Sequence, residues 1–141
     1  MISVKTHSIV DYVLGVLLIA APFVFGMTGV DTAPYVFWTM GAGLIIYSLL
    51  TDYDYSVAKL IPVSVHMALD VVFGISLVLA PLVLDYQPAI SGGQYFVHWI
   101  FGLGTISLVA LTLPPREEEV RLGHFDEAML DQHRDDYNKA A

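Results

Sequence analysis

The chain has 141 residues, of which 56% are hydrophobic and 14% are charged, whereas about 25% are charged in an average soluble domain. Its formal net charge is −8 and it contains no cysteine, which argues against nucleic acid as a partner and excludes disulfides and thiol chemistry. Between Thr6 and Asp52 the only charged residues are Asp11 and Asp31. A soluble helical protein would need polar faces there, so we expect an integral membrane protein whose main partner is the lipid bilayer.

Four apolar runs follow one another, at about residues 6–26, 35–50, 62–84 and 95–113. Each has close to the ~20 residues with which a helix crosses a bilayer. Pro22 near the end of the first run predicts a kink. The expected fold is an all-α transmembrane four-helix bundle built from two parallel two-helix repeats. Residues 1–59 form the first repeat, residues 60–115 form the second, and residues 116–141 form an acidic, partly helical cytoplasmic tail.

A His-x3-Asp-x3-Gly-x6-Pro pattern is present twice, 59 residues apart. The two copies consist of His7, Asp11, Gly15 and Pro22, and of His66, Asp70, Gly74 and Pro81. On a helix the four positions of a copy fall within an arc of roughly 80°. One stripe of each helix therefore carries a polar pair, a small residue and a proline.

The second run of each half carries a further duplicated pattern. Trp38 with Gly41 recurs as Trp99 with Gly102, at an offset of 61 residues. The tryptophans are expected at the level of the aromatic belt, and the glycines allow close contact between helices. Two patterns repeated at nearly the same offset predict a tandem duplication.

Residues 11–26 and 70–84 resemble the SPW repeat, a two-helix module of prokaryotic integral membrane proteins. In that module a polar residue precedes a glycine by four positions, and a Ser-Pro-Trp follows with its proline seven positions after the glycine. This chain keeps the spacing but reads Ala-Pro-Phe at 21–23 and Ala-Pro-Leu at 80–82, so the serine and the tryptophan are missing. The resemblance covers residues 7–113. It implies a membrane location and supplies no catalytic residue.

All six basic residues of the chain lie on one side of the four-span arrangement. The positive-inside rule therefore places both termini and the 51–61 connection in the cytoplasm, with the chain in the cell inner membrane. In the tail, Leu122, Phe125 and Met129 form a thin apolar stripe among mixed charges. Such a segment is typical of a solvated tail, and the alternative is a docking site for a soluble partner. A second copy of the chain or another membrane protein is a further candidate partner.

The polar pairs His7 with Asp11 and His66 with Asp70 are neighbours on one helical face. Because the repeats are parallel, the two pairs can meet at the pseudo-symmetry axis. Three interpretations remain open: a hydrogen-bonded structural link, a site that handles protons or ions for transport, and a haem or metal site between the first and third helices. His98, at the start of the fourth run, is expected to serve the opposite membrane interface.

No arrangement of catalytic residues accompanies these pairs. The sequence has no nucleophile motif, phosphate-binding loop or metalloprotease motif, so we expect neither an enzyme nor a catalytic residue, and we assign no cofactor and no metal. The sequence is most consistent with a small multi-pass membrane protein that has a structural or partner-binding role. The alternative is a component of proton- or ion-coupled transport.

Overall fold

The computed structural model describes residues 2–112, 129, 130 and 132–134. Its long helices are α1 (Val4–Val24), α2 (Ala33–Leu50), α3 (Val63–Val83) and α4 (Gly92–Leu111). A short 3-10 turn, η1 (Gln87–Ala89), precedes α4. The predicted all-α fold with four helices is confirmed. The predicted apolar stripe of the tail lies largely outside the described residues, since Leu122 and Phe125 are not among them.

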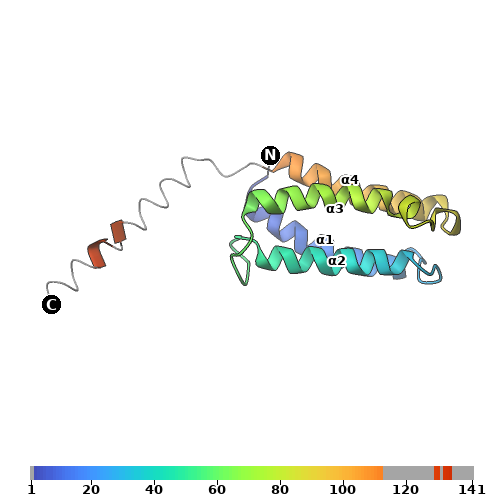
Figure 1. The fold of residues 1–141 in the computed structure, drawn as a ribbon, viewed down its shortest axis with the longest axis horizontal. Coiled ribbons are helices and arrows are strands. Elements are labelled where there is room, and N and C mark those ends of the chain that lie inside the picture. Colours follow the sequence, from blue (N-terminus) through green and yellow to red (C-terminus); the bar gives the residue numbers. More distant parts are fainter. Residues whose placement is uncertain (1, 113–128, 131, 135–141) are drawn as a thin grey trace.

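The four helices run side by side, with α1 and α3 starting at the same end of the bundle (Figure 1). We call this end, which holds residue 2, residue 112 and the 51–62 connection, the terminal end. The opposite end, with the connections 25–32 and 84–91, is the turn end. All four helices are long and apolar enough to cross a membrane, and at most 39% of each apolar window is buried. Exposed residues such as Phe23, Val72 and Leu82 therefore form an outer surface suited to lipid.

Local capping interactions determine where the helices begin. The Ser3 hydroxyl accepts from the Thr6 amide at 3.1 Å, so α1 begins before residue 6. At α4, Ser91 and Gln94 form a reciprocal capping box, which satisfies two amides that a helix start leaves unpaired. This box draws two glycines into the helix, and α4 begins at Gly92, three residues before the predicted start at 95.

The two helices that end at the turn end stop in the same way. After α1, the Met27 amide donates to the Pro22 carbonyl at 2.8 Å, and Gly26 has a φ of 64°. After α3, the Tyr86 amide donates to the Pro81 carbonyl at 3.1 Å, and Asp85 has a φ of 55°. A left-handed residue that ends a helix is usually glycine, so Asp85 adopts a conformation that costs free energy for a residue with a side chain.

Glycines bring α1 against α2 and α3 against α4 at very close range. A Cβ atom added to Gly41 would lie 2.6 Å from the carbonyl oxygen of Gly15, and one added to Gly102 would lie 2.5 Å from that of Gly74. Only glycine permits such an approach of two backbones. These contacts create two tight helix pairs, which we call the first pair (α1 and α2) and the second pair (α3 and α4).

Contacts between the two pairs are much sparser than contacts within them. Large side chains fill the space along the axis, and Leu18, Phe37, Leu44 and Leu77 are all fully buried there. Each such side chain stabilises the bundle by packing rather than by a hydrophobic effect between helices, because lipid is itself apolar. The polar groups that join the pairs are concentrated at the terminal end.

Candidate functional site: a buried histidine and aspartate centre

Four ionisable side chains meet inside the bundle near the terminal end. α1 supplies His7 and Asp11, α3 supplies His66 and Asp70, and each of the four is fully buried. The four-residue spacing places the two side chains of a helix on the same face. Because α1 and α3 run in the same direction, the two faces meet with their residues at the same depth. We call these four side chains the His/Asp centre.

The shortest contacts of the His/Asp centre run between the helix pairs. His7 Nε2 lies 3.0 Å from Asp70 Oδ2, and His66 Nε2 lies 3.1 Å from Asp11 Oδ2. Within a helix the corresponding distances are longer, 3.4 Å for His7 to Asp11 and 3.3 Å for His66 to Asp70. Each histidine is thus hydrogen-bonded to the aspartate of the other pair rather than to that of its own helix.

A threonine orients each histidine from behind. His7 Nδ1 lies 2.7 Å from Thr112 Oγ1, and His66 Nδ1 lies 2.7 Å from Thr51 Oγ1. Each hydroxyl also donates its single proton to the carbonyl oxygen four residues earlier, at 2.7 Å. The hydroxyls must therefore accept from Nδ1–H, which fixes the tautomer and turns Nε2 toward the centre. A proton or another cation must then separate each Nε2 from the facing carboxylate oxygen.

Two tyrosines complete the centre and break its symmetry. The Tyr47 hydroxyl donates to Asp70 Oδ1, while the Tyr53 hydroxyl lies 3.4 Å from Asp11 Oδ2. Asp11 Oδ1 is buried and has no hydrogen-bond partner among the described residues. Tyr53 comes from the 51–62 connection and covers the centre, with its ring 4.8 Å from that of His66. Burial, and then the carboxylates of Asp11 and Asp70, raise the pKa of Tyr53 well above its usual value, so its hydroxyl stays protonated and can donate.

The repeat pattern of the sequence extends to the two threonines that contact the histidines of the His/Asp centre. Thr51 and Thr112 are 61 residues apart, which is the offset that relates the Trp-Gly patterns. Tyr47 and Tyr53 have no tyrosine counterpart in the second half at that offset, where Leu108 and Pro114 stand. No duplication marks them, and pattern reasoning could not have assigned them to the centre.

A second, smaller polar contact lies at the turn end. His98 is fully buried, whereas the sequence suggested a role at the membrane interface. Its Nδ1 donates to the Gln94 carbonyl and its Nε2 accepts from the Tyr86 hydroxyl, both at 2.9 Å. Its ring lies 4.7 Å from that of Phe37. Both ring nitrogens of His98 are satisfied, so this histidine fills a structural position.

The remaining predicted residues lie away from the centre. Pro22 and Pro81 are buried inside α1 and α3, near their ends, and the kink expected at Pro22 stays a prediction. Trp38 stacks on Phe23 with 5.7 Å between ring centroids, and Trp99 is 39% exposed. Both tryptophans therefore lie toward the outside of the bundle.

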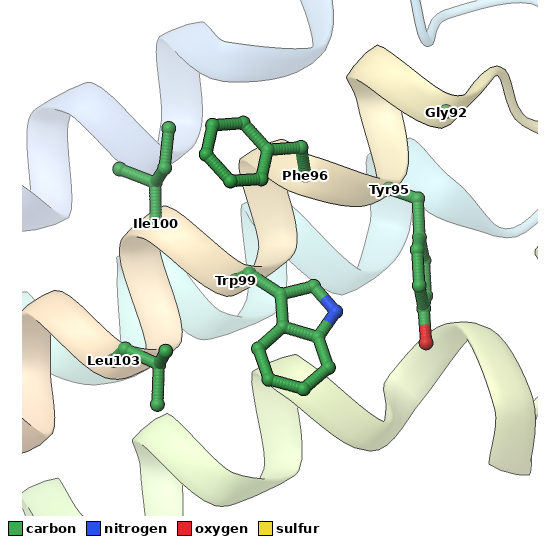
Figure 2. A pocket seen from close by; sticks show the side chains of 6 residues that line it. All are labelled: Gly92, Tyr95, Phe96, Trp99, Ile100 and Leu103. Carbon is green, nitrogen blue, oxygen red and sulfur yellow. The ribbon is translucent and has the colours of Figure 1, made fainter.

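The outer face of α4 carries a shallow hollow (Figure 2). It is lined by aromatic and aliphatic side chains together with one glycine: Gly92, Tyr95, Phe96, Trp99, Ile100 and Leu103. A ligand site would gather several polar groups around an apolar cavity, and this hollow does not. It belongs to the surface that faces lipid.

These features define a small four-helix integral membrane protein with a paired polar centre buried at one end. Compared with models of known protein families, the chain matches the SPW repeat domain over residues 5–118. The chain therefore belongs to the SPW repeat family, as the spacing of its duplicated residues suggested. The comparisons with curated proteins and with solved structures gave no match.

Proposed function

We propose that this SPW repeat protein is a structural or partner-binding membrane protein made of two tandem helix pairs, which the His/Asp centre holds together. The observation that carries the proposal is the crossed pairing of His7 with Asp70 and of His66 with Asp11. Contacts within one helix would stabilise only that helix. Crossed contacts make each pair depend on the other.

The distribution of contacts supports this role. Within a pair, the glycine contacts already hold the two helices together. Between the pairs, packing is sparse, and polar groups inside a membrane bundle each contribute about 0.6–2 kcal/mol to helix association. With one shared proton for each crossed contact, two protons balance the charges of the two carboxylates. The centre is then neutral overall, which limits the cost of burying charge in hydrocarbon.

The orientation of the chain is part of the proposal. Lys5 and Lys59 lie at the terminal end and form ion pairs with Asp54 and Asp52, and the other basic residues follow α4 in the sequence. We therefore place the terminal end in the cytoplasm and the turn end across the inner membrane. A cysteine introduced at Ser56 should resist an impermeant thiol reagent in intact cells, and one introduced at Gly29 should react. The reverse labelling would reject this orientation.

Coupled transport, the alternative role, has less support. Transport through the bundle would need a polar path from the His/Asp centre to the turn end. Leu18, Leu77 and Phe37 fill the axis between them and are fully buried. The Thr105 hydroxyl, deep in α4, donates to its own helix. Haem binding has less support too, because the carboxylates of Asp11 and Asp70 occupy the space between the two histidines.

A double-mutant cycle on the full-length chain tests the linking role. His7→Leu and Asp70→Leu each leave a buried partner unpaired, which costs roughly 3–5 kcal/mol in soluble proteins. The double variant removes both partners and should be clearly more stable than the sum of the two losses predicts. Unfolding in mixed detergent micelles measures the stability of the two single variants and of the double variant. The control is Ser76→Ala, which removes a hydroxyl that is hydrogen-bonded within its own helix. Additive losses, or singles as stable as the control, would reject the link. Proton flux into liposomes that requires Asp11 would favour transport instead.

A further inference from the structure

We propose that the His/Asp centre is also a binding site for one divalent first-row transition-metal ion, of which Zn²⁺ is the reference. The ligand atoms are Nε2 of His7 and His66 and one carboxylate oxygen each of Asp11 and Asp70. This inference goes beyond the linking role and does not depend on it. Imidazole and carboxylate ligands together suit zinc, iron and manganese. Soft ions that prefer thiolates find no cysteine in the chain.

The spacing of the four ligand atoms fits a small tetrahedral ion. The four distances between a histidine Nε2 and an aspartate Oδ2 lie between 3.0 and 3.4 Å, and all four ligand atoms lie within 4.8 Å of one another. A zinc ion bound at ~2.0–2.1 Å to four such atoms separates neighbouring ligands by about 3.3 Å. Only modest adjustment of the side chains would bring all four onto one ion.

The threonine contacts hold both histidines in the orientation and tautomer that metal binding requires. A histidine that binds a metal through Nε2 almost always donates its Nδ1–H to an oxygen, and this contact fixes both the ring and its tautomer. Thr112 provides that oxygen for His7, and Thr51 provides it for His66. A structural link could use either tautomer and either ring nitrogen. Because both histidines make this contact, the Nε2 lone pairs of His7 and His66 both face the middle of the His/Asp centre.

The unpaired oxygen of Asp11 is an independent observation that points to a cation. Asp70 Oδ1 receives the Tyr47 hydroxyl, but Asp11 Oδ1 is fully buried without a partner among the described residues. A buried acceptor without a partner costs about 1–3 kcal/mol, more when the group is charged. A cation bound at Oδ2 would not fill that hydrogen-bond position, but it would stabilise the negative charge that both oxygens of the Asp11 carboxylate share. One divalent ion would also neutralise the two carboxylates while both histidines remain neutral.

Zinc content measured on the full-length chain tests the site. The protein is purified without a histidine tag in mild detergent, treated with EDTA, exposed to ZnCl₂ and desalted. The wild type should retain close to one zinc ion per chain. The His7→Gln/His66→Gln double variant should lose most of it. His98→Gln removes a buried histidine outside the centre, and His124→Gln/His133→Gln removes those of the tail, so both controls should keep the zinc.

Two outcomes of the zinc-content measurement overturn the proposal. One is a folded wild type that retains no zinc, and the other is a His7→Gln/His66→Gln variant that binds as much zinc as the wild type. Because that variant also loses linking groups, X-ray absorption of the zinc-loaded wild type gives a second measurement. It should show about four nitrogen and oxygen ligands at ~2.0–2.1 Å, two of them imidazoles. A shell of six oxygens, or one with a single imidazole, would equally reject the site.

The metal site and the linking role can fail separately. If wild type exposed to ZnCl₂ retains no zinc and unfolds with the same stability as the EDTA-treated protein, the metal site is rejected. The coupling between His7 and Asp70 can still be present in that case. If zinc binds while the double-mutant cycle of His7 and Asp70 in EDTA is additive, the linking role is rejected and the metal site stands.

Discussion

The glycine contacts within each helix pair allow a quantitative prediction for Gly102→Ala. The added Cβ would lie 2.5 Å from the Gly74 carbonyl oxygen and 2.5 Å from Val78 Cγ2. An ordinary contact is at least 3.4 Å, so α3 and α4 must separate by about 0.9 Å. Because one of the contacting atoms belongs to the backbone, a change of side-chain rotamer cannot relieve the clash. Overpacking of this kind costs about 1–3 kcal/mol.

Gly104→Ala is a matched control two residues further along the same helix. A Cβ at Gly104 meets no atom within 4 Å. Alanine is favoured over glycine in a helix by about 0.8–1 kcal/mol, and this gain applies to both variants. The difference in stability between Gly102→Ala and Gly104→Ala therefore isolates the clash. We expect Gly104→Ala to be the more stable by about 1–3 kcal/mol.

Reversible unfolding in mixed detergent micelles, followed by circular dichroism, measures the difference. The first pair offers the same comparison, since a Cβ at Gly41 would lie 2.6 Å from the Gly15 carbonyl oxygen and a Cβ at Gly43 meets nothing within 4 Å. Equal stability of Gly102→Ala and Gly104→Ala would refute the close backbone contact. A large difference in one pair and none in the other would refute the structural equivalence of the two pairs.

Three further predictions follow from the caps and the centre. Asp85→Gly should stabilise the chain by about 0.5–1 kcal/mol in the same unfolding assay, because Asp85 has a positive φ. Gly26→Val should destabilise it, because Gly26 also has a positive φ. A loss of stability in Asp85→Gly would contradict the left-handed cap. Thr51→Val and Thr112→Val each remove the acceptor of a histidine Nδ1–H and should each cost about 1–2 kcal/mol; unchanged stability in either variant would contradict these hydrogen bonds. Tyr53 has a raised pKa in the fold, so its contribution to stability is complete below its unfolded pKa of about 10 and is lost as the pH rises above it. Between pH 9 and 11, the free energy of unfolding should therefore fall less steeply above pH 10 in Tyr53→Phe than in the wild type, by up to about 1.4 kcal/mol per pH unit. Equal slopes in the two proteins would contradict the raised pKa of Tyr53.

Sequence reasoning predicted the helices because hydropathy and duplication are strong signals in a membrane protein. The predicted ends differ from the observed ones by up to three residues, most at α4, where the Ser91–Gln94 capping box extends the helix to Gly92. The contacts of Gly41 and Gly102 follow from the small-residue pattern. The spacing could not show that Gly43 and Gly104 contact nothing, because that depends on how each helix is rotated.

For the centre, the sequence indicated which residues carry the polar groups but not how they pair. An i,i+4 spacing favours contact within a helix, and the crossed bonds from His7 to Asp70 and from His66 to Asp11 depend on the distance and rotation between α1 and α3. Tyr53 reaches the centre from a connection, where no periodicity exists to predict its direction. The sequence predicts an interfacial His98 because it gives only the position of this residue near the start of an apolar run. Its contacts depend on the packing of the turn end.

The contact between Phe37 and His98 joins two different residues at matching positions of the two halves. These residues are 61 positions apart and so stand at corresponding places in the two pairs, yet their rings meet at 4.7 Å. A dimer of two identical half-length chains would bring two phenylalanines or two histidines together at that point. A single chain can place an apolar ring against a polar one, and can add the Tyr86 hydroxyl where the first half has Met27. Within this single chain the two halves thus differ at these positions, while the residues of the His/Asp centre remain matched.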